Sequence, residues 1–360
     1  MKLVKVLVET LVDEGLQNAQ MSNAREIIAR LDPECFHVTT FHVRAPDDRV
    51  RRRRNTRLIR LPESRQTIRI LTTFLVGDHD LVFYVKASPA SRAYAWLRSL
   101  RGRRRLTVAC VESQANWKDE PTITPENVRL IEQTILRADY LFSNSPRVQQ
   151  SLHDEYGLSS KVVPTGVDTE FFCPALESSP LQRAVVLFVG SLRPFKRPDL
   201  VLEAARRFPQ ADFVLVGDGV LASELRRESG ELPNVLMTGS LNAMEIREQY
   251  RRADVFFFPS AWEGSPKVLA EAAACGVPAV ARDSYEPQTV IDGKTGILCA
   301  DDVSLLDALK ILLKDAVLRR SMGRAARQHI AQFDWNAVTR KWEEVFLRVT
   351  SQNRTREVNW

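Results

Sequence analysis

The sequence predicts an α/β protein made of two doubly wound domains, each with a parallel sheet. Three observations lead to this fold class: the chain has 360 residues, short apolar runs recur along it, and amphipathic stretches separate those runs. One hydrophobic core seldom serves a chain of this length, so two domains are expected. Runs that are apolar throughout indicate strands buried on both faces, as in parallel sheets covered by helices.

Each half of the chain contains six candidate strands, separated by stretches with helical periodicity. The runs of the first half are LVKVLVE (3–9), FHVTTFHV (36–43), RLIRL (57–61), LVFYV (81–85), LTVACV (106–111) and DYLFSNS (139–145). The runs of the second half are AVVLFVG (184–190), FVLVG (213–217), VLMTG (235–239), DVFFFPS (254–260), PAVA (278–281) and GILC (296–299). The second set is expected to form one sheet.

A short internal echo supports two similar halves. RADYLFSNS (137–145) and RADVFFFPS (252–260) share Arg-Ala-Asp, four strand residues and a final serine. Between the halves, the stretch 162–184 is rich in Pro, Ser and turn residues, and a linker is expected near 175–182. The two domains then leave a ligand cleft at the carboxyl ends of their strands.

The expected domains are residues 1–178 and 179–335. Residues 336–360 hold most of an amphipathic helix, FDWNAVTRKWEEVFLRV (333–349), and a tail. This last helix either crosses back to the first domain or packs on the second. The sequence does not decide between the two.

Cysteine, histidine and hydropathy patterns argue against a metal site and a membrane span. The five cysteines are scattered without a C-x-x-C pair, which fits a reducing cytoplasm, and the five histidines show no ligand spacing. Asp78-His79-Asp80 resembles a D-x-D metal motif but precedes its strand, at the wrong edge of a sheet. No signal peptide and no run of about 18 apolar residues is present.

Basic residues concentrate in one region. From Arg44 to Thr107 there are 17 Lys and Arg against 5 Asp and Glu, including RVRRRRNTRLIR (49–60) and RSLRGRRR (98–105). Such a region favours an anionic partner: a phospholipid surface, a phosphorylated acceptor or nucleic acid. No nucleic-acid-binding motif accompanies the arginines, so nucleic acid is not expected. The helix expected at 89–105 is either packed on the sheet with a solvated basic rim or a membrane-surface contact through residues such as Trp96.

Two glutamates eight positions apart bracket a predicted helix start. Glu263 follows the strand DVFFFPS, and Glu271 lies within KVLAEAAA. We expect Ser265 to be the N-cap, Pro266 to be the first helical residue and Gly276 to end the helix. The first turn then offers unpaired amides to a phosphate, with one carboxylate on either side.

This pattern resembles the E-x7-E motif of retaining glycosyltransferases of family 4, which have the GT-B fold of two facing Rossmann-like domains with an interdomain cleft. The resemblance extends over about 180 residues. It includes PTGVDTEFFCP (164–174), FVGSLRPFKRPDLVLEA (188–204), the run from FVLVGDG to VLMTGSL, ADVFFFPSAWEGSPKVLAEAAACGVPAV (253–280) and DGKTGILC (292–299).

The resemblance implies a role for each matched residue. Glu263 would hold hydroxyls of the transferred sugar, Glu271 the ribose hydroxyls, and Lys196 would neutralise the leaving diphosphate. Fixed cations and amides stabilise that departing charge, so no metal is required. The other donor-side candidates are Gly190, Gly217, Gly264, Ser265, Pro266, Lys267 and Val268.

The sequence departs from the family pattern in four places. Ser191 stands where arginine is usual, and Arg193 either reaches the same phosphate or is a solvated loop residue. Glu112 stands where a histidine is common, either in the site with an unassigned role or as a structural strand-end acid. Gly15 alone remains of a glycine pair; Gln17 and Asn18 line the acceptor side or are plain loop residues. Gln288 replaces a glutamate, which puts recognition of the donor's sugar in doubt.

The resemblance therefore implies a retaining, metal-independent glycosyltransferase. Its first domain, residues 1–178, would bind the acceptor, and its second, residues 179–335, the nucleotide sugar. The enzyme would move a sugar from a UDP- or GDP-linked donor to an acceptor such as a lipid-linked or polysaccharide precursor, without a cofactor. A cytoplasmic protein, peripheral on the inner face of the plasma membrane, is the expected setting. The alternatives are a nucleotide-sugar epimerase or hydrolase of the same fold, a non-catalytic nucleotide-sugar-binding module, and an RNA-associated protein.

Overall fold

The computed structural model describes residues 3–15, 19–100, 105–118, 123–175 and 183–357. The chain divides into two compact units. The first comprises Met1–Thr165 and Trp335–Trp360, and the second comprises Gly166–Asp334. The chain therefore enters the second unit earlier than the expected boundary at residue 178.

Contacts of the segment after Gly166 explain this boundary. Val167 forms a parallel bridge with Asp334, and Thr169 Oγ1 donates to the Asp334 carboxylate at 2.7 Å. Arg327 donates to the backbone carbonyl of Thr169 at 2.9 Å. The Pro- and Ser-rich composition identified a connecting region, but these contacts involve residues about 160 positions apart, which composition does not register.

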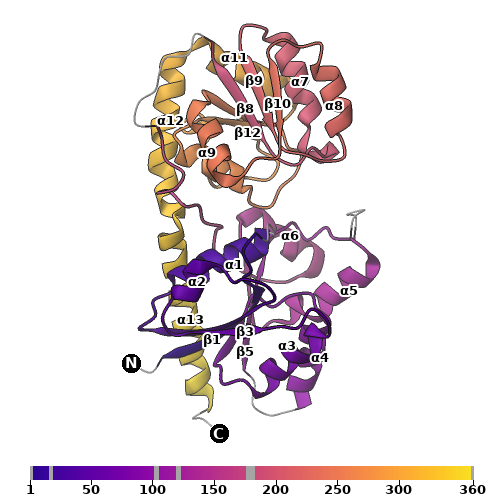
Figure 1. The fold of residues 1–360 in the computed structure, drawn as a ribbon, viewed down its shortest axis with the longest axis vertical. Helices are drawn as coiled ribbons and strands as arrows, with labels where there is room; N and C mark the ends of the chain where they lie inside the picture. Colours follow the sequence, from indigo (N-terminus) through magenta and orange to yellow (C-terminus); the bar gives the residue numbers. More distant parts are fainter. Residues whose placement is uncertain (1–2, 16–18, 101–104, 119–122, 176–182, 358–360) are drawn as a thin grey trace. The chain divides into compact units, whose positions relative to one another are not determined.

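The first unit contains a seven-stranded sheet in its described residues, with neighbouring strands parallel (Figure 1). The order is β3-β2-β1-β4-β5-β6-β7. The strands are β1 (Val4–Leu11), β2 (Phe36–His42), β3 (Thr56–Arg60), β4 (Leu81–Phe83), β5 (Leu106–Val111), β6 (Tyr140–Ser143) and β7 (Lys161–Val162). The six expected strands are confirmed. The seventh, β7, has only two residues, too few for a hydrophobic pattern.

The second unit contains a six-stranded parallel sheet in the order β10-β9-β8-β11-β12-β13. The strands are β8 (Val185–Val189), β9 (Asp212–Val216), β10 (Val235–Gly239), β11 (Val255–Phe258), β12 (Ala279–Arg282) and β13 (Gly296–Cys299). All six match the expected runs, and the single sheet is confirmed.

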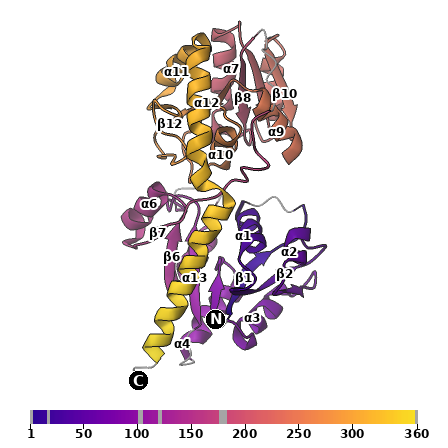
Figure 2. The same cartoon turned by 90° about the vertical axis from the view of Figure 1, so that its left-hand side faces the viewer.

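Helices connect the strands in both units (Figures 1 and 2). The first unit has α1 (Ala19–Arg30), α2 (Asp48–Arg52), α3 (Gln66–Val76), α4 (Pro89–Leu100), α5 (Pro125–Gln133), η1 (Ile135–Arg137), α6 (Pro146–Tyr156) and α13 (Trp335–Glu357). The second has η2 (Pro194–Lys196), α7 (Pro198–Arg207), α8 (Ala222–Ser229), α9 (Ala243–Arg252), α10 (Lys267–Ala274), α11 (Asp302–Lys314), α12 (Ala316–Ile330) and η3 (Ala331–Phe333).

Alternate residues of β1 pack on opposite faces of the first sheet. Val6 joins the cluster formed with α1 and α13, and Leu7 joins the cluster formed with α3 and α4. On α13, Trp342 is 2% exposed and its ring lies 4.7 Å from that of Phe83 and 5.1 Å from that of Phe142. The last helix therefore packs on the first sheet, which settles the question that the sequence left open.

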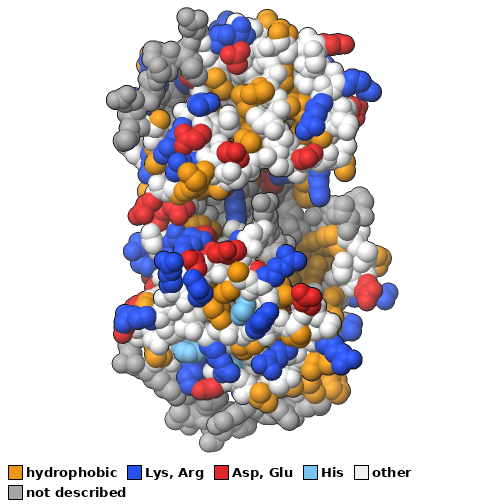
Figure 3. Space-filling model, viewed as in Figure 1, with side chains coloured by type: hydrophobic (Ala, Val, Ile, Leu, Met, Phe, Trp, Pro, Cys, Tyr) orange, Lys and Arg blue, Asp and Glu red, His pale blue; other side chains and the backbone are white. Residues whose placement is uncertain are grey.

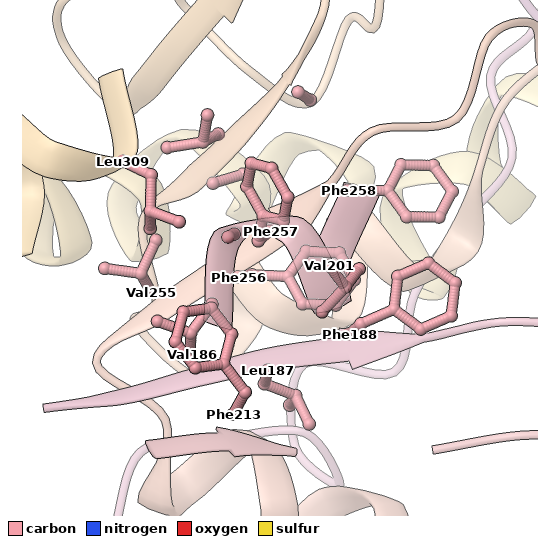
Figure 4. Packing of buried hydrophobic residues seen from close by; sticks show 14 of the residues in the cluster. Val186, Leu187, Phe188, Val201, Phe213, Val255, Phe256, Phe257, Phe258 and Leu309 are labelled. Atoms are coloured by element: carbon pink, nitrogen blue, oxygen red, sulfur yellow. The ribbon is translucent and has the colours of Figure 1, made fainter. Parts of the chain in front are cut away.

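The core of the second unit is centred on the aromatic strand β11 (Figure 4). Phe256, Phe257 and Phe258 are each fully buried, so both faces of this strand are covered. The rings of Phe188 and Phe258 stack with centroids 6.4 Å apart. An apolar run of this kind is what a central strand of a parallel sheet requires.

In each sheet the strand order reverses beside the first strand of the unit. The reversal lies between β1 and β4 in the first unit and between β8 and β11 in the second. Loops that leave the carboxyl ends of such neighbouring strands run in opposite directions, and ligands of doubly wound sheets bind in the crevice between them. These two edges are therefore the places to look for a site.

Within the described ranges, no helix is both long enough and apolar enough to cross a bilayer.

Candidate functional site

Lys196 and Glu263 meet where the strand order of the second sheet reverses. Lys196 ends η2 in the loop after β8, and Glu263 lies in the loop after β11. The Lys196 ammonium donates to Glu263 Oε1, and Ser260 Oγ donates to the same oxygen at 2.6 Å. The Lys196 and Glu263 side chains are only 16% and 12% exposed. The pair is therefore largely removed from water, where the attraction between its charges is stronger.

Aromatic rings surround this ion pair. Lys196 Nζ lies 5.2 Å from the ring centre of Phe258 and 5.3 Å from that of Phe195. Phe195 in turn stacks on Trp262 with ring centroids 4.4 Å apart. The Ala261 amide donates to the Phe195 carbonyl at 2.7 Å. These contacts hold the loop after β8 against the loop after β11, so the Lys196 ammonium has a fixed position.

A second set of charges supports the loop that carries Lys196. Arg197 has φ 53°, in the left-handed region that a residue with a side chain seldom adopts. Its guanidinium lies 2.9 Å from the Asp302 carboxylate. Arg282 also pairs with Asp302 and donates to the Pro259 carbonyl at 3.2 Å. Asp302 thus links the carboxyl ends of β8, β11 and β12.

Gly217 is required by a close approach of two backbones. Its φ is 138°, and a Cβ added there would lie 1.9 Å from the carbonyl oxygen of Gly190. The Gly190 amide donates to the Val216 carbonyl at 3.0 Å. Any side chain at 217 would push the loops after β8 and β9 apart. The structure thus gives Gly217 a packing role, whether or not a ligand approaches it.

The helix between the two glutamates starts one residue later than expected. The expectation that Ser265 caps it and Pro266 begins it is wrong: α10 begins at Lys267, Pro266 is the N-cap residue with φ −69° and ψ 114°, and no side-chain cap bond is formed. The extended ψ of Pro266 is typical of an N-cap residue, whose backbone is not helical although its carbonyl accepts the first hydrogen bond of the helix.

Gly276 ends this helix as the sequence predicts. It has φ 77°, and its amide donates to the Ala273 carbonyl at 3.0 Å. The Val277 amide donates to the Ala272 carbonyl at 3.0 Å. This pair of bonds is the Schellman arrangement, which needs a left-handed residue and so favours glycine.

Glu271 points from α10 toward the buried tyrosine of α9. Tyr250, which is fully buried, donates through its hydroxyl to Glu271 Oε2 at 3.1 Å and approaches the Val268 carbonyl at 3.2 Å. Burial raises the pKa of the Glu271 carboxyl, while the nearby Lys267 ammonium and the Tyr250 hydrogen bond act in the opposite direction. The Tyr250 hydroxyl therefore fixes the position of the Glu271 carboxyl group but carries no charge that would balance it.

The other donor-side candidates lie along the same edge. Arg193 is exposed at the start of η2, and Gly190 follows β8 directly. The residues between the glutamates are partly buried: Gly264, Ser265, Pro266, Lys267 and Val268. The structure thus gathers Lys196, Glu263 and this segment at one sheet edge.

The Asp13 side chain holds the loop after β1 in the first unit. Asp13 is 3% exposed, and its carboxylate accepts from the Val43 amide at 3.0 Å and from the Arg44 amide. Gly15 has φ 77° with open space around its α-carbon. Asp13 therefore ties the β1 loop to the β2 loop. Gln17 and Asn18, the other acceptor-side candidates, lie outside the described residues.

Glu112 lies at the carboxyl end of β5 and is held by two side chains from other elements. Asn23 Nδ2 of α1 donates to Glu112 Oε1 at 2.9 Å, and the Tyr84 hydroxyl, at the end of β4, donates to the same oxygen. Asn144 Nδ2 donates to the Glu112 backbone carbonyl at 3.2 Å. The sequence offered two alternatives for Glu112, and this arrangement places it in a polar cluster.

Sequence reasoning missed four residues of these clusters. Asn23 carried a usable signal, since a polar residue interrupts the apolar face formed by Ala24, Ile27 and Ile28 of α1. Ser260 ends the echo between the two halves, but its partner could not be inferred. In the sequence, Tyr84 and Tyr250 cannot be distinguished from ordinary aromatic residues of the core. The missed residues are Asn23, Tyr84, Tyr250 and Ser260.

The described residues contain no group of three His, Cys, Asp or Glu side chains placed to hold a metal ion. Asp78 and Asp80 lie at the amino end of β4, where Asp80 accepts from the Lys5 amide at 2.8 Å and Asp78 pairs with the Lys5 ammonium. These contacts give the Asp78-His79-Asp80 stretch a structural role at the edge remote from the ligand crevice.

Much of the first arginine run is used within the fold. Arg53 is buried and donates to the Leu31 carbonyl at 3.0 Å and to the Phe36 carbonyl at 2.9 Å. Its neighbours pair with acids: Arg49 with Glu26, Arg51 and Arg52 with Asp48, and Arg54 with Glu34. Figure 3 shows basic and acidic side chains interspersed on this unit's visible face. The run at 49–54 therefore offers less uncompensated charge than its sequence suggests.

The two glutamates differ in their expected effect on stability. The pKa of Glu271 is raised from 4.5, so the folded state disfavours its ionised form. That cost is absent below about pH 4.5 and grows as the pH rises toward the folded-state pKa. Glu271→Gln should therefore melt at a higher temperature than the wild type at pH 7 and converge with it near pH 4.

Glu263→Gln is the matched comparison and should melt at a lower temperature at pH 7. It leaves the partly desolvated Lys196 ammonium without its charged partner, which costs on the order of 1–3 kcal/mol. Thermal unfolding from pH 4 to 8 measures both variants. If both substitutions changed the melting temperature equally and in the same direction, the surroundings described for the two glutamates would be contradicted.

Two family descriptions match consecutive parts of the chain. Residues 14–171 match "Glycosyltransferase Family 4", and residues 175–329 match "Glycosyl transferases group 1". In solved structures, the sucrose-phosphate synthase of Thermosynechococcus elongatus aligns over 97% of this chain and 100% of its own, with a TM-score of 0.79 and 18% identity. Anabaena HepE with UDP and glucose aligns over 95% and 99%, with a TM-score of 0.74 and 18% identity. These likenesses support the GT-B fold.

Curated relatives are similar at the level of sequence. The D-inositol 3-phosphate glycosyltransferase of Corynebacterium diphtheriae is 33% identical over 67% of this chain and 63% of its own length. The chain thus spans a little under two thirds of that relative. The GDP-mannose-dependent alpha-(1-6)-phosphatidylinositol monomannoside mannosyltransferase of Mycolicibacterium smegmatis is 30% identical over 74% of this chain and 76% of its own. The chain belongs to the group 1 glycosyltransferases, with the domain pair of family 4.

Proposed function

We propose that the chain is a retaining glycosyltransferase that takes a sugar from a nucleotide donor and needs no metal ion. The observation that carries this proposal is the Lys196 ammonium, held by Glu263 beside the start of α10 at the carboxyl edge of the second sheet. A fixed cation next to the start of a helix matches the charge of a diphosphate. UDP and GDP are the proposed carriers.

The candidate donor-side residues of the second unit each have a role in this proposal. The backbone N–H groups of residues 264–268, except Pro266, which has none, bind the diphosphate. Glu271 accepts hydrogen bonds from the ribose hydroxyls. Glu263 accepts from hydroxyls of the transferred sugar and also orients Lys196. When the bond to the sugar breaks, negative charge grows on the diphosphate. A cation already in place stabilises that charge without reorganising.

Arg193 is proposed as a further cation for the diphosphate. It is the N-cap residue of η2, the short helix that Lys196 ends, so both side chains lie on one loop. In the first unit, Glu112 is proposed to contact a sugar. The stereochemical outcome is proposed as retention, and the anomeric configuration of the product, measured by NMR, decides it. Turnover that persists in EDTA would support independence from metal ions.

The relatives suggest classes of donor and acceptor. The mycobacterial relative is named for GDP-mannose and a phosphatidylinositol monomannoside, and the corynebacterial relative for an inositol phosphate. HepE is described with UDP and UDP-glucose. For this chain we propose a hydroxyl-bearing acceptor with an anionic or lipid-linked portion, in keeping with the excess of arginine in its first unit. Nucleic acid is not among the proposed partners.

Nucleoside diphosphates should raise the melting temperature of the protein, and a tighter ligand should raise it more at the same concentration. A ligand that binds only the folded state stabilises it by about 2.7 kcal/mol at one hundred times its Kd. We expect UDP or GDP to give a larger shift than ADP, and Glu271→Ala to abolish the shift. The exposed Glu203 of α7 provides the control, since Glu203→Ala should keep it. A full shift in the Glu271 variant would refute the ribose contact.

Lys196→Ala should separate catalysis from binding. Removing one preorganised charge contact to a developing anion typically lowers kcat by about 100-fold or more. The Kd of the sugar donor should change much less, because the ground-state diphosphate keeps its amide contacts. Donor titration and steady-state kinetics measure the two effects. Equal losses of donor affinity and kcat would assign Lys196 to binding alone.

We also propose that α3 and α4 contact an anionic membrane surface at the cytoplasmic face. Ile68 and Val76 of α3 are 65% and 73% exposed, and Trp96 of α4 is 65% exposed. Arg69 and Arg92 are exposed on the same two helices, which pack together through Phe74 and Tyr94. Exposed apolar and aromatic side chains among arginines suit a lipid headgroup region.

Vesicle sedimentation tests this contact. Arg69→Glu and Arg92→Glu should each weaken binding to phosphatidylglycerol vesicles by about fivefold or more, since one basic residue near the surface contributes about 1 kcal/mol. Trp96→Ser should weaken it at all salt concentrations. Arg52→Glu on α2 is the matched control, because Arg52 already pairs with Asp48. If only the Arg52→Glu control lost vesicle binding, the membrane contact would be assigned to α2 instead of α3 and α4.

A further inference from the structure

A series of contacts connects Glu263 with Asp302, the first residue of α11. Ser260 Oγ donates to Glu263 Oε1 at 2.6 Å, and Pro259 precedes Ser260 in the chain. The Pro259 carbonyl accepts from Arg282 Nε at 3.2 Å, and the Arg282 guanidinium pairs with the Asp302 carboxylate. The Arg282 side chain is only 12% exposed. The loop after β11 is therefore connected to α11 through the Arg282 side chain.

A second series of contacts connects Asp302 with Lys196. Arg197 Nη2 lies 2.9 Å from Asp302 Oδ2, and Arg197 Nη1 donates to Asp302 Oδ1 at 3.3 Å. Arg197 follows Lys196 directly, and the Lys196 ammonium donates to Glu263. The two series together form a closed ring. Because the ring holds Lys196 and Glu263 from both sides, the two groups are less free to separate than an isolated ion pair would be.

Arg197 takes part in this ring from a strained backbone conformation. Its φ of 53° and ψ of 47° are left-handed, a conformation that glycine adopts more easily than a residue with a side chain. Arg197 also pairs with Asp199 at 3.0 Å, but Asp199 is only two positions further along the same segment. The contact with Asp302 on α11 is the one that fixes the loop against another element. It therefore accounts for an arginine at a position that favours glycine.

The Asp302 carboxylate is not what begins α11. Asp301 is the N-cap residue: its carboxylate accepts from the Ser304 amide at 2.8 Å, and its amide donates to Ser304 Oγ at 3.1 Å. Asp302 instead faces two guanidinium groups, those of Arg197 and Arg282, which come from different loops. Charge-assisted bonds to guanidinium groups have defined geometry, so one carboxylate between two arginines sets the spacing of those loops.

We propose that Asp302 is a positioning residue for the transfer reaction, because it holds the Lys196 ammonium and the Glu263 carboxylate in place through Arg197 and Arg282. The inference rests on the proposed function and deepens it. A cation stabilises the leaving diphosphate most when it needs no reorganisation during the reaction. A displacement of about 1 Å in such a group can lower the rate by about 100-fold.

The coupling between Lys196 and Glu263 tests the ring without a ligand. A double-mutant cycle of Lys196→Ala and Glu263→Gln, measured by urea unfolding, gives the coupling free energy of the pair. In an Asp302→Asn background, this coupling should fall to less than about half of its wild-type value. Asp307→Asn should leave it unchanged and is the matched control, since Asp307 is another carboxylate of α11 that pairs with an arginine, Arg207, at 3.1 Å.

Kinetics test the consequence for the reaction. Release of UDP from UDP-glucose, or of GDP from GDP-mannose, with water as the acceptor gives kcat, and calorimetry gives the Kd of the same donor. Asp302→Asn should lower kcat by about 10-fold and change the donor Kd by less than about twofold. In the Lys196→Ala background, Asp302→Asn should have no further effect on kcat, because the group that it positions is gone.

Arg197→Gly separates the ring from the stability of the fold. Glycine relieves the backbone strain, and the ion pairs that are lost are partly exposed, so the melting temperature should change little. The coupling and kcat should nevertheless fall as they do in Asp302→Asn. Arg65→Gly is the matched control and should leave both unchanged, since Arg65 is an exposed residue of the first unit with φ 60° and no side-chain cap bond.

Two results would overturn the role of Asp302. One is full coupling between Lys196 and Glu263 in Asp302→Asn, whatever the stability of that variant; should it fail to fold, full coupling in Arg197→Gly has the same meaning. The other is an equal loss of kcat with and without the Lys196 side chain. Failure of the proposed function has a different signature, because the wild type would then bind neither UDP nor GDP while the coupling still reports on the ring.

Discussion

The ion pair between Lys196 and Glu263 is the constraint on which the second unit's site depends. It joins the loops after β8 and β11, the two strands between which the strand order reverses. Such a pair gains little net stability, because removing both charges from water offsets their attraction. Stacked aromatics and the Asp302 bridge nevertheless hold it in place. These contacts fix the position of the Lys196 ammonium at the sheet edge.

The two units share a strand order but prepare their edges differently. In the second, the loops carry a cation, a carboxylate and a helix start, which suit a charged ligand. In the first, the corresponding edge carries Glu112, which accepts hydrogen bonds from Asn23 and from Tyr84, a residue with φ 59°. The residues that follow the strands thus give the same framework a different set of side chains at each edge.

The fold could be predicted from the sequence because its signals are local. Runs such as DVFFFPS mark strands by themselves, whereas β7 has too few residues to do so. The E-x7-E spacing identified the candidate donor site, but the first helical residue was misplaced by one position, since both Ser265 and Pro266 are acceptable before a helix. Asn23, Tyr84 and Tyr250 act through partners 18 to 89 positions away. Their partners depend on tertiary packing, which no local pattern encodes.

A crystal structure with a bound nucleoside diphosphate tests the central claim most directly, because it reports where the phosphates lie. The account predicts the diphosphate against the backbone amides between Gly264 and Val268, with the Lys196 ammonium on its oxygens and the ribose hydroxyls on Glu271. A diphosphate bound elsewhere, with the Lys196 and Glu263 pair untouched, would contradict it.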